Sequence, residues 1–250
     1  MFTWGVIGLL VGSVLGLTGA GGALIAVPFL VHLAEKTIFE ATLISLIPVF
    51  FASSLNWFFQ KNLTHYLTAI MIACFSFFGS YLFSDIKLIS SPLLVKSTYL
   101  SLAVIGAILI WRKKKSTAHS KPNKQSLLFL VKTVLSGFIL GVIITMTGLG
   151  GGVLLTPWLH YAFKYPLKNA VATSLFTTTI ATAISFFNQK TLLSKTEILP
   201  QQILLLIIGI LIAAIAIKLT TKQYENLPMD QIRKWVYTTV VLFSVIAMLL

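Results

Sequence analysis

The chain has 250 residues, of which 57% are hydrophobic and only 10% are charged. Its apolar runs exceed the roughly 4 to 8 residues of a buried strand and the roughly 10 to 14 of a core helix. A soluble globular domain is therefore excluded, and the sequence predicts an all-α, polytopic helical membrane protein. The formal net charge of +13 sits mainly at the ends of apolar runs, so we expect contacts with membrane lipid and no nucleic-acid partner.

The first half of the chain contains four predicted apolar segments. The first, 4–33, would measure roughly 45 Å as one helix, against a hydrocarbon core of roughly 30 Å. It must therefore tilt steeply, kink or fold back. A polar turn with Asp85 and Lys87 is predicted between the last two spans of this half. The spans after the first segment are predicted at 41–59, 66–83 and 93–111.

A hydrophilic linker at 112–126 follows, and it begins with four consecutive basic residues, Arg112 to Lys115. Short loops this rich in lysine and arginine are retained on the cytoplasmic side. We therefore predict a multi-pass membrane protein whose linker faces the cytoplasm. The total is about eight transmembrane helices, depending on whether each first segment crosses once or re-enters. The second-half segments are predicted at 127–163, 170–187, 198–218 and 232–250.

The second half repeats the first at a single offset of 129 residues without a gap. Glycine, proline and Gln-Lys coincidences at one offset are not expected by chance, and they indicate tandem duplication of a four-span unit. We predict a first transmembrane repeat at 1–111, a basic linker at 112–126 and a second repeat at 127–250. The pattern leaves parallel and inverted repeats open. Matched positions include Gly8 and Gly137, Gly12 and Gly141, Gly21 and Gly150, Pro28 and Pro157, and Gln60 and Gln189.

Each repeat carries a glycine cluster within its long first segment. Glycines spaced by four, as at Gly8 and Gly12, form packing seams between helices, whereas adjacent glycines favour a break in the helix. A helix that restarts after a break aims its free N–H groups and the positive end of its dipole at the cavity, which suits an anion. The alternative is a structural hinge or packing notch. The cluster residues predicted to bind substrate are Thr18, Gly19, Gly21, Gly22, Thr147, Gly148, Gly150 and Gly151.

The serines Ser45 and Ser174 occupy matched positions in the next span and complete the predicted substrate site. Hydroxyls in membrane helices commonly bond to a carbonyl one turn back, which is the structural alternative. The six acidic residues all lie in loops or at span ends, so no carboxylate relay for a cation is predicted. No catalytic, metal-binding or nucleotide-binding motif is present, so we expect neither an enzyme nor a metal or other cofactor.

The second cluster, with Pro157 to Leu159 and the run Ala170 to Leu175, resembles the TauE/SafE family of membrane permeases. The first half departs from the motif at Ala23, where a third glycine is expected, and at Ile44, where threonine is expected. The resemblance covers essentially the whole chain. It implies a multi-pass permease of the cell inner (cytoplasmic) membrane for small anions, often sulfur-containing, such as sulfite or organosulfonates.

The sequence thus predicts a secondary transporter with a site near the midplane, between the repeats. Its predicted partners are a small anionic substrate and membrane lipid, and an ion or substrate gradient drives alternating access. One alternative is an anion channel on the same scaffold. Another is a membrane assembly factor that docks partners through the basic linker.

Overall fold

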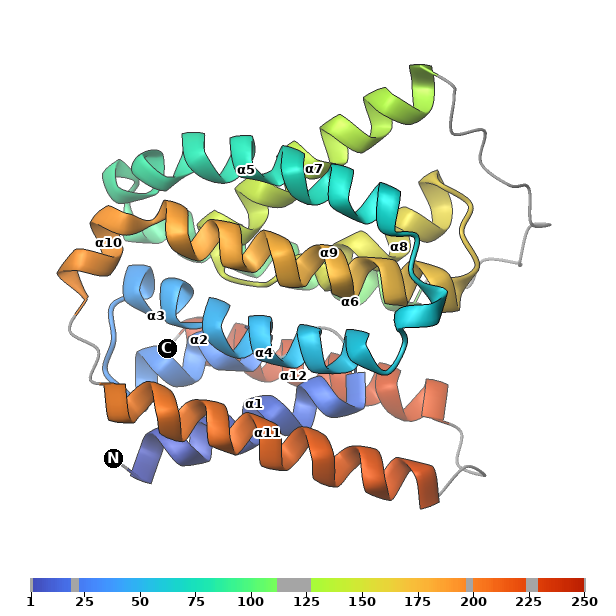
Figure 1. The fold of residues 1–250 in the computed structure, drawn as a ribbon. Helices are drawn as coiled ribbons and strands as arrows, with labels where there is room; N and C mark the ends of the chain where they lie inside the picture. Colours follow the sequence, from blue (N-terminus) through green and yellow to red (C-terminus); the bar gives the residue numbers. More distant parts are fainter. Residues whose placement is uncertain (1, 19–22, 112–126, 197–199, 224–228, 250) are drawn as a thin grey trace.

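The computed structural model describes residues 2–18, 23–111, 127–196, 200–223 and 229–249, and these contain helices and no strand. The predicted all-α, polytopic helical membrane class is confirmed. The helices, labelled in Figure 1, are α1 (Phe2–Thr18), α2 (Ala23–His32), α3 (Ile38–Ile44), α4 (Leu46–Phe58), η1 (Lys61–Leu63), α5 (Tyr66–Ile89), α6 (Pro92–Trp111), α7 (Leu127–Thr147), α8 (Gly152–Ala162), α9 (Leu167–Asn188), α10 (Lys190–Lys195), α11 (Pro200–Gln223) and α12 (Met229–Leu249).

Five segments in the described part of the chain are long and apolar enough to cross a membrane. Shorter apolar stretches lie in α1, α11 and α12, at Thr3–Val14, Pro200–Ala213 and Thr238–Met248. The chain is therefore a multi-pass membrane protein, and the number of eight crossings stays a prediction. The five candidate spans are Ile38–Phe58, Tyr66–Ile89, Pro92–Leu109, Leu127–Thr147 and Leu167–Asn188.

The long first segment of the second half is a helical hairpin, because α8 runs back along α7. The rings of Phe129 and Phe163 lie 5.4 Å apart, although these residues stand at the far ends of the two helices. Lys132 Nζ donates to the carbonyl of Ala162 at 3.3 Å. The glycine cluster is therefore the tip of a hairpin that enters the protein and returns to the side on which it began.

The helices that the 129-residue offset pairs run in opposite directions. In α4 and α9, Ser53 bonds to Thr179 at 3.1 Å, and the ring of Trp57 lies 4.8 Å from that of Phe176. The residue number rises along α4 as it falls along α9, so these helices are antiparallel. In Figure 1, α1 begins on the left and α7 on the right. The relation that the sequence left open is therefore inverted.

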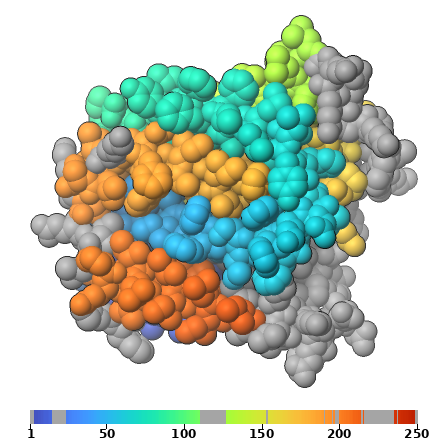
Figure 2. Space-filling view, in the orientation of Figure 1, coloured from blue at the N-terminus to red at the C-terminus, as the bar shows by residue number. Residues whose placement is uncertain are grey.

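One face of the molecule shows this arrangement directly. In Figure 2, α5, α9, α4 and α11 lie side by side in that order. The sequence offset pairs α4 with α9, and it places α5 on residues 195–218, most of which belong to α11. The two outer helices of this face are therefore equivalent to each other, and so are its two inner helices.

The predicted glycine seams are confirmed at Gly8, Gly12, Gly137 and Gly141. A Cβ atom at Gly8 would lie 2.5 Å from the carbonyl oxygen of Leu206 in α11, and one at Gly137 would lie 2.5 Å from that of Ile72 in α5. Each seam joins a helix of one half to a helix of the other. The halves therefore share their main interfaces, and the boundaries at 1–111, 112–126 and 127–250 stay a prediction.

Two loops repeat the same rare backbone conformation. Glu35, which follows α2, has φ 52°, and Lys164, which follows α8, has φ 54°. The two residues stand 129 positions apart. Residues other than glycine rarely adopt this left-handed conformation. Its recurrence therefore indicates that the loops after α2 and α8 are structurally equivalent.

The predicted turn after the third span is wrong in one respect. The sequence predicts that this span ends at residue 83, but α5 continues to Ile89. Lys87 lies within the helix and is completely buried, whereas Asp85 is exposed. A lysine followed within a few residues by serines and a proline resembles a turn in sequence. Only tertiary packing shows which side chain faces inward.

Candidate functional site

The hairpin tip between α7 and α8 has the backbone conformation that the glycine cluster predicted. Helix α7 ends at Thr147 and α8 begins at Gly152, and φ is 67°, 62° and 34° at Gly148, Gly150 and Gly151. These left-handed values cost little at glycine, which has no Cβ atom. The residues of the tip are buried.

The first glycine cluster lies between α1 and α2. Helix α1 ends at Thr18 and α2 begins at Ala23. Gly19, Gly21 and Gly22 lie outside the described residues, as does the side chain of Thr18. Their predicted contribution to the site stays a prediction.

The tip is held by a residue of the first half. Ser45 Oγ donates to the carbonyl of Gly148 at 3.1 Å and also contacts the carbonyl of Thr42 at 2.9 Å. Ser45 stands at the junction of α3 and α4, shortly before Pro48, which has no N–H to continue the helical hydrogen bonds. The structure therefore brings two of the predicted site residues, Ser45 and Gly148, into direct contact.

The other predicted hydroxyls have partners inside the protein. Thr147 Oγ1 donates to the carbonyl of Ile143 at 2.6 Å and accepts from the N–H of Leu149 at 3.3 Å. Ser174 Oγ donates to the carbonyl of Val171 at 2.9 Å, as the structural alternative expected.

Ser174 also bonds to a residue that sequence reasoning missed. Its Oγ lies 2.6 Å from Thr156 Oγ in α8. Ser174 thus contacts the second arm of the hairpin, whereas Ser45 contacts the tip. Thr156 aligns with Val27 at the repeat offset, so the repeat carried no signal for it.

The tip offers unused hydrogen-bond donors. In the described part of the chain, the amides of Gly150 and Gly151 donate to no other residue, while the Gly151 carbonyl accepts from Leu154 and Leu155 at 3.1 and 2.8 Å. The positive end of the α8 dipole lies at this same point. Free amides and a helix N-terminus in a buried setting favour a negatively charged group.

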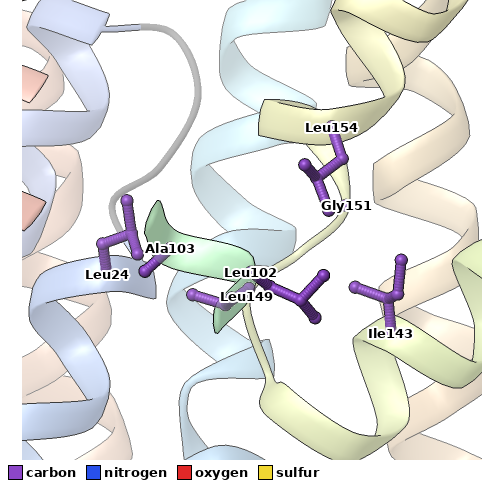
Figure 3. A pocket seen from close by; sticks show the side chains of 7 residues that line it. All are labelled: Leu24, Leu102, Ala103, Ile143, Leu149, Gly151 and Leu154. Atoms are coloured by element: carbon purple, nitrogen blue, oxygen red, sulfur yellow. The ribbon is translucent and has the colours of Figure 1, made fainter. Parts of the chain in front are cut away.

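A cavity of about 10 Å³ lies beside the tip, which is room for roughly one water molecule. Figure 3 shows Leu149 of the tip projecting toward Leu24, which stands near the start of α2, while Leu102 of α6 projects toward Ile143. The described ends of both broken segments thus line one cavity. It is too small for a polyatomic anion. The lining residues are Leu24, Leu102, Ala103, Ile143, Leu149, Gly151 and Leu154.

Residues 4–248 match the family described as sulfite exporter TauE/SafE. The chain belongs to the TauE/SafE family. Two probable membrane transporter proteins of Xylella fastidiosa, from strains 9a5c and Temecula1, are 28% and 30% identical to it over 172 and 173 residues. These matches cover 67% of this chain and 66% of each relative, so the chain spans slightly less than two thirds of their length.

A third relative matches over a shorter stretch. A probable membrane transporter protein of Methanocaldococcus jannaschii is 41% identical over 66 residues, which is 24% of this chain and 25% of the relative. No solved structure matches the chain. In the described part of the chain, no group of three or more histidine, cysteine or acidic residues could hold a metal ion.

Proposed function

We propose that this protein is a secondary transporter of small anions, sulfur-containing ones such as sulfite or organosulfonates. The observation that carries the proposal is the buried tip at Gly148 to Gly151, where free amides and the N-terminus of α8 meet. The names of the family and of its relatives support transport. Buried donors without a nearby carboxylate suit an anion better than a cation.

The backbone of the tip is the first choice for contact with the substrate. Gly150 and Gly151 supply the free amides, and Gly148 supplies the left-handed turn that exposes them. The other three predicted residues already have hydrogen-bond partners inside the protein, so we assign them the role of holding the tip in place. They are Thr147, Ser45 and Ser174. By the repeat, Thr18, Gly19, Gly21 and Gly22 provide the matching half of the site.

Alternating access is the mechanism that this architecture favours. Antiparallel equivalent helices and two broken segments beside one cavity are typical of carriers in which one half rocks against the other. In this proposal the protein lies in the cytoplasmic membrane, and the basic linker 112–126 is inside the cell.

Sulfite flux in proteoliposomes tests the site. In Gly150→Leu the new side chain would collide with Val49 and would require positive φ at a branched residue, so we expect insertion and a monodisperse protein but no flux. Gly5→Leu is the matched control, because no atom lies within 4 Å of a Cβ at Gly5. Unchanged flux in Gly150→Leu would contradict the assignment.

The same vesicles separate the alternatives. A carrier shows saturable sulfite uptake and counterflow, whereas a channel shows neither. An assembly factor would lose its role on neutralisation of Arg112 to Lys115, and the glycine variants would only lower its stability.

A further inference from the structure

Lys87 is a completely buried cation near the end of α5. Its Nζ donates to Gln189 Oε1, at the end of α9, at 2.8 Å, and Gln189 is itself 1% exposed. In the described part of the chain, no carboxylate forms an ion pair with Lys87. A buried ammonium paired only with a neutral amide is costly, and within a membrane-spanning helix it points to function.

Hydrogen bonds connect this lysine with the hairpin. Gln189 Nε2 donates to the carbonyl of Ser185 at 3.1 Å, and Thr145 Oγ1 donates to Ser185 Oγ at 3.3 Å. Thr145 stands two residues before Thr147, at the end of α7. A continuous set of buried polar groups therefore runs from Lys87 to the base of the glycine tip.

Two further hydroxyls along these helices have no partner. Ser80 Oγ and Thr178 Oγ1 are buried and make no hydrogen bond to a described residue. Ser80 shares a face of α5 with Lys87, seven residues on. Helical side chains lean toward the N-terminus of their helix, so the stem of Lys87 lies over the turn between them.

Ser80 is also level with Gly141 of α7. A Cβ atom at Gly141 would lie 2.8 Å from the backbone nitrogen of Ser80, and Thr145 follows Gly141 by one helical turn. On α9, Thr178 shares a face with Ser185 and Gln189. The unpartnered hydroxyls thus belong to the same polar seam as Lys87.

We infer that Lys87 and Gln189 form a second anion site, which binds a small oxyanion between α5, α7 and α9. This inference rests on the proposed function. The anion replaces Gln189 Oε1 as acceptor for the ammonium, and the hydroxyl of Ser80 and the Nε2 amide of Gln189 supply further donors. In Figure 1 α5 ends on the left, opposite the side on which α7 begins, so the site serves entry or exit at that face.

Calorimetric titration of the purified protein with sulfite, and separately with sulfate, tests this site. Lys87→Met keeps the length of the side chain and removes its charge, so we expect the affinity of this second site to fall roughly ten- to hundredfold while the tip still binds the anion. Lys61→Met is the control, because Lys61 is exposed and its loss changes the net charge equally. We expect Lys61→Met to keep the affinity within about twofold, and Lys87→Arg to retain most of it.

Thermal stability separates an anion site from a structural role. Lys87→Met leaves Gln189 Oε1 without its donor, but it also removes the larger desolvation cost of a buried ammonium. Lys87→Met should therefore melt no earlier than the wild type. Gln189→Glu is nearly isosteric, and its carboxylate would pair with Lys87 and compete with the anion. It should therefore raise the melting temperature and weaken binding at the same time. Early melting of Lys87→Met with normal sulfite affinity would overturn the inference.

The results also separate this inference from the proposed function. Sulfite flux with unchanged affinity in Lys87→Met and Gln189→Glu overturns the second site and leaves the transporter standing. Binding that depends on Lys87, without flux of either anion, supports the second site and overturns the transporter. No binding of sulfite or sulfate by the wild type overturns both.

Discussion

Ser45 and Gly148 lie 103 residues apart and are joined by a hydrogen bond of 3.1 Å. Gly148 needs to be glycine for two independent reasons. Its φ of 67° disfavours a Cβ atom, and such an atom would collide with Ser45 Oγ and with the carbonyl of Thr42. The contact therefore works only if the backbone of the tip and the kink at Ser45 fit together.

Ser45→Ala is expected to destabilise the protein by about 1 kcal/mol, because the buried carbonyl of Gly148 loses its donor. We also expect lower sulfite flux, since the tip is no longer anchored to the first half. The measurement is the melting temperature of the purified protein together with flux in vesicles. Ser54→Ala is the control, because Ser54 Oγ bonds only within its own helix, to Phe51. Equal effects of the two variants would refute the anchoring role.

At the scale of elements, the glycine seams decide how the helices associate. In lipid there is little hydrophobic drive between helices, so close backbone approach supplies the contact energy. The seam of Gly8 and Gly12 against α11 has its counterpart in the seam of Gly137 and Gly141 against α5. Each half is therefore completed by a helix of the other.

Gly141→Ala is expected to push α7 away from α5, because its Cβ atom would collide with the carbonyl oxygen of Ser76. Overpacking of this kind costs about 1–3 kcal/mol. Gly12→Ala should have a similar effect in the other seam, where the Cβ atom would lie 2.7 Å from the Cα of Ile210. Melting temperatures of purified variants measure both. Gly5→Ala, which meets open space, should show no loss, and a loss as large as that of Gly141→Ala would exclude the seam explanation.

At the scale of the whole molecule, inversion places equivalent loops on opposite faces. The loop with Glu35 and the loop with Lys164 have the same backbone conformation at matched positions. In Figure 1 they lie at opposite ends of the helices. Parallel repeats would place both on one side of the membrane.

Cysteine labelling tests this topology. Both variants carry serine in place of the exposed Cys74. Of Glu35→Cys and Lys164→Cys, one should react with a membrane-impermeant maleimide in intact cells and the other only in inverted vesicles. The linker is predicted to be cytoplasmic, and it leads into α7, which begins on the same side as the Lys164 loop. We therefore expect Glu35→Cys to be labelled from outside the cell. Ser116→Cys, in the linker, is the control and should label with Lys164→Cys. Labelling of both loop cysteines from one side would contradict inversion.

The sequence by itself determined the class of the protein, the second helix break and the small-residue seams. Long apolar runs leave only membrane helices, adjacent glycines at Gly150 and Gly151 stop a helix, and glycines spaced by four mark a close contact. These properties depend on local composition and spacing, which a single chain displays directly. The match of the two halves at one offset was visible for the same reason.

Only the tertiary structure decided how these pieces meet. The hairpin, the inversion and the bond between Ser45 and Gly148 depend on contacts between distant segments, which spacing does not encode. Lys87 shows the limit most clearly. Its neighbours in sequence are those of a polar turn, while its burial beside Gln189 comes from the packing of α5 against α9. The direction of a side chain relative to a distant helix is a property of the folded chain, and here it separates a surface lysine from a candidate anion site.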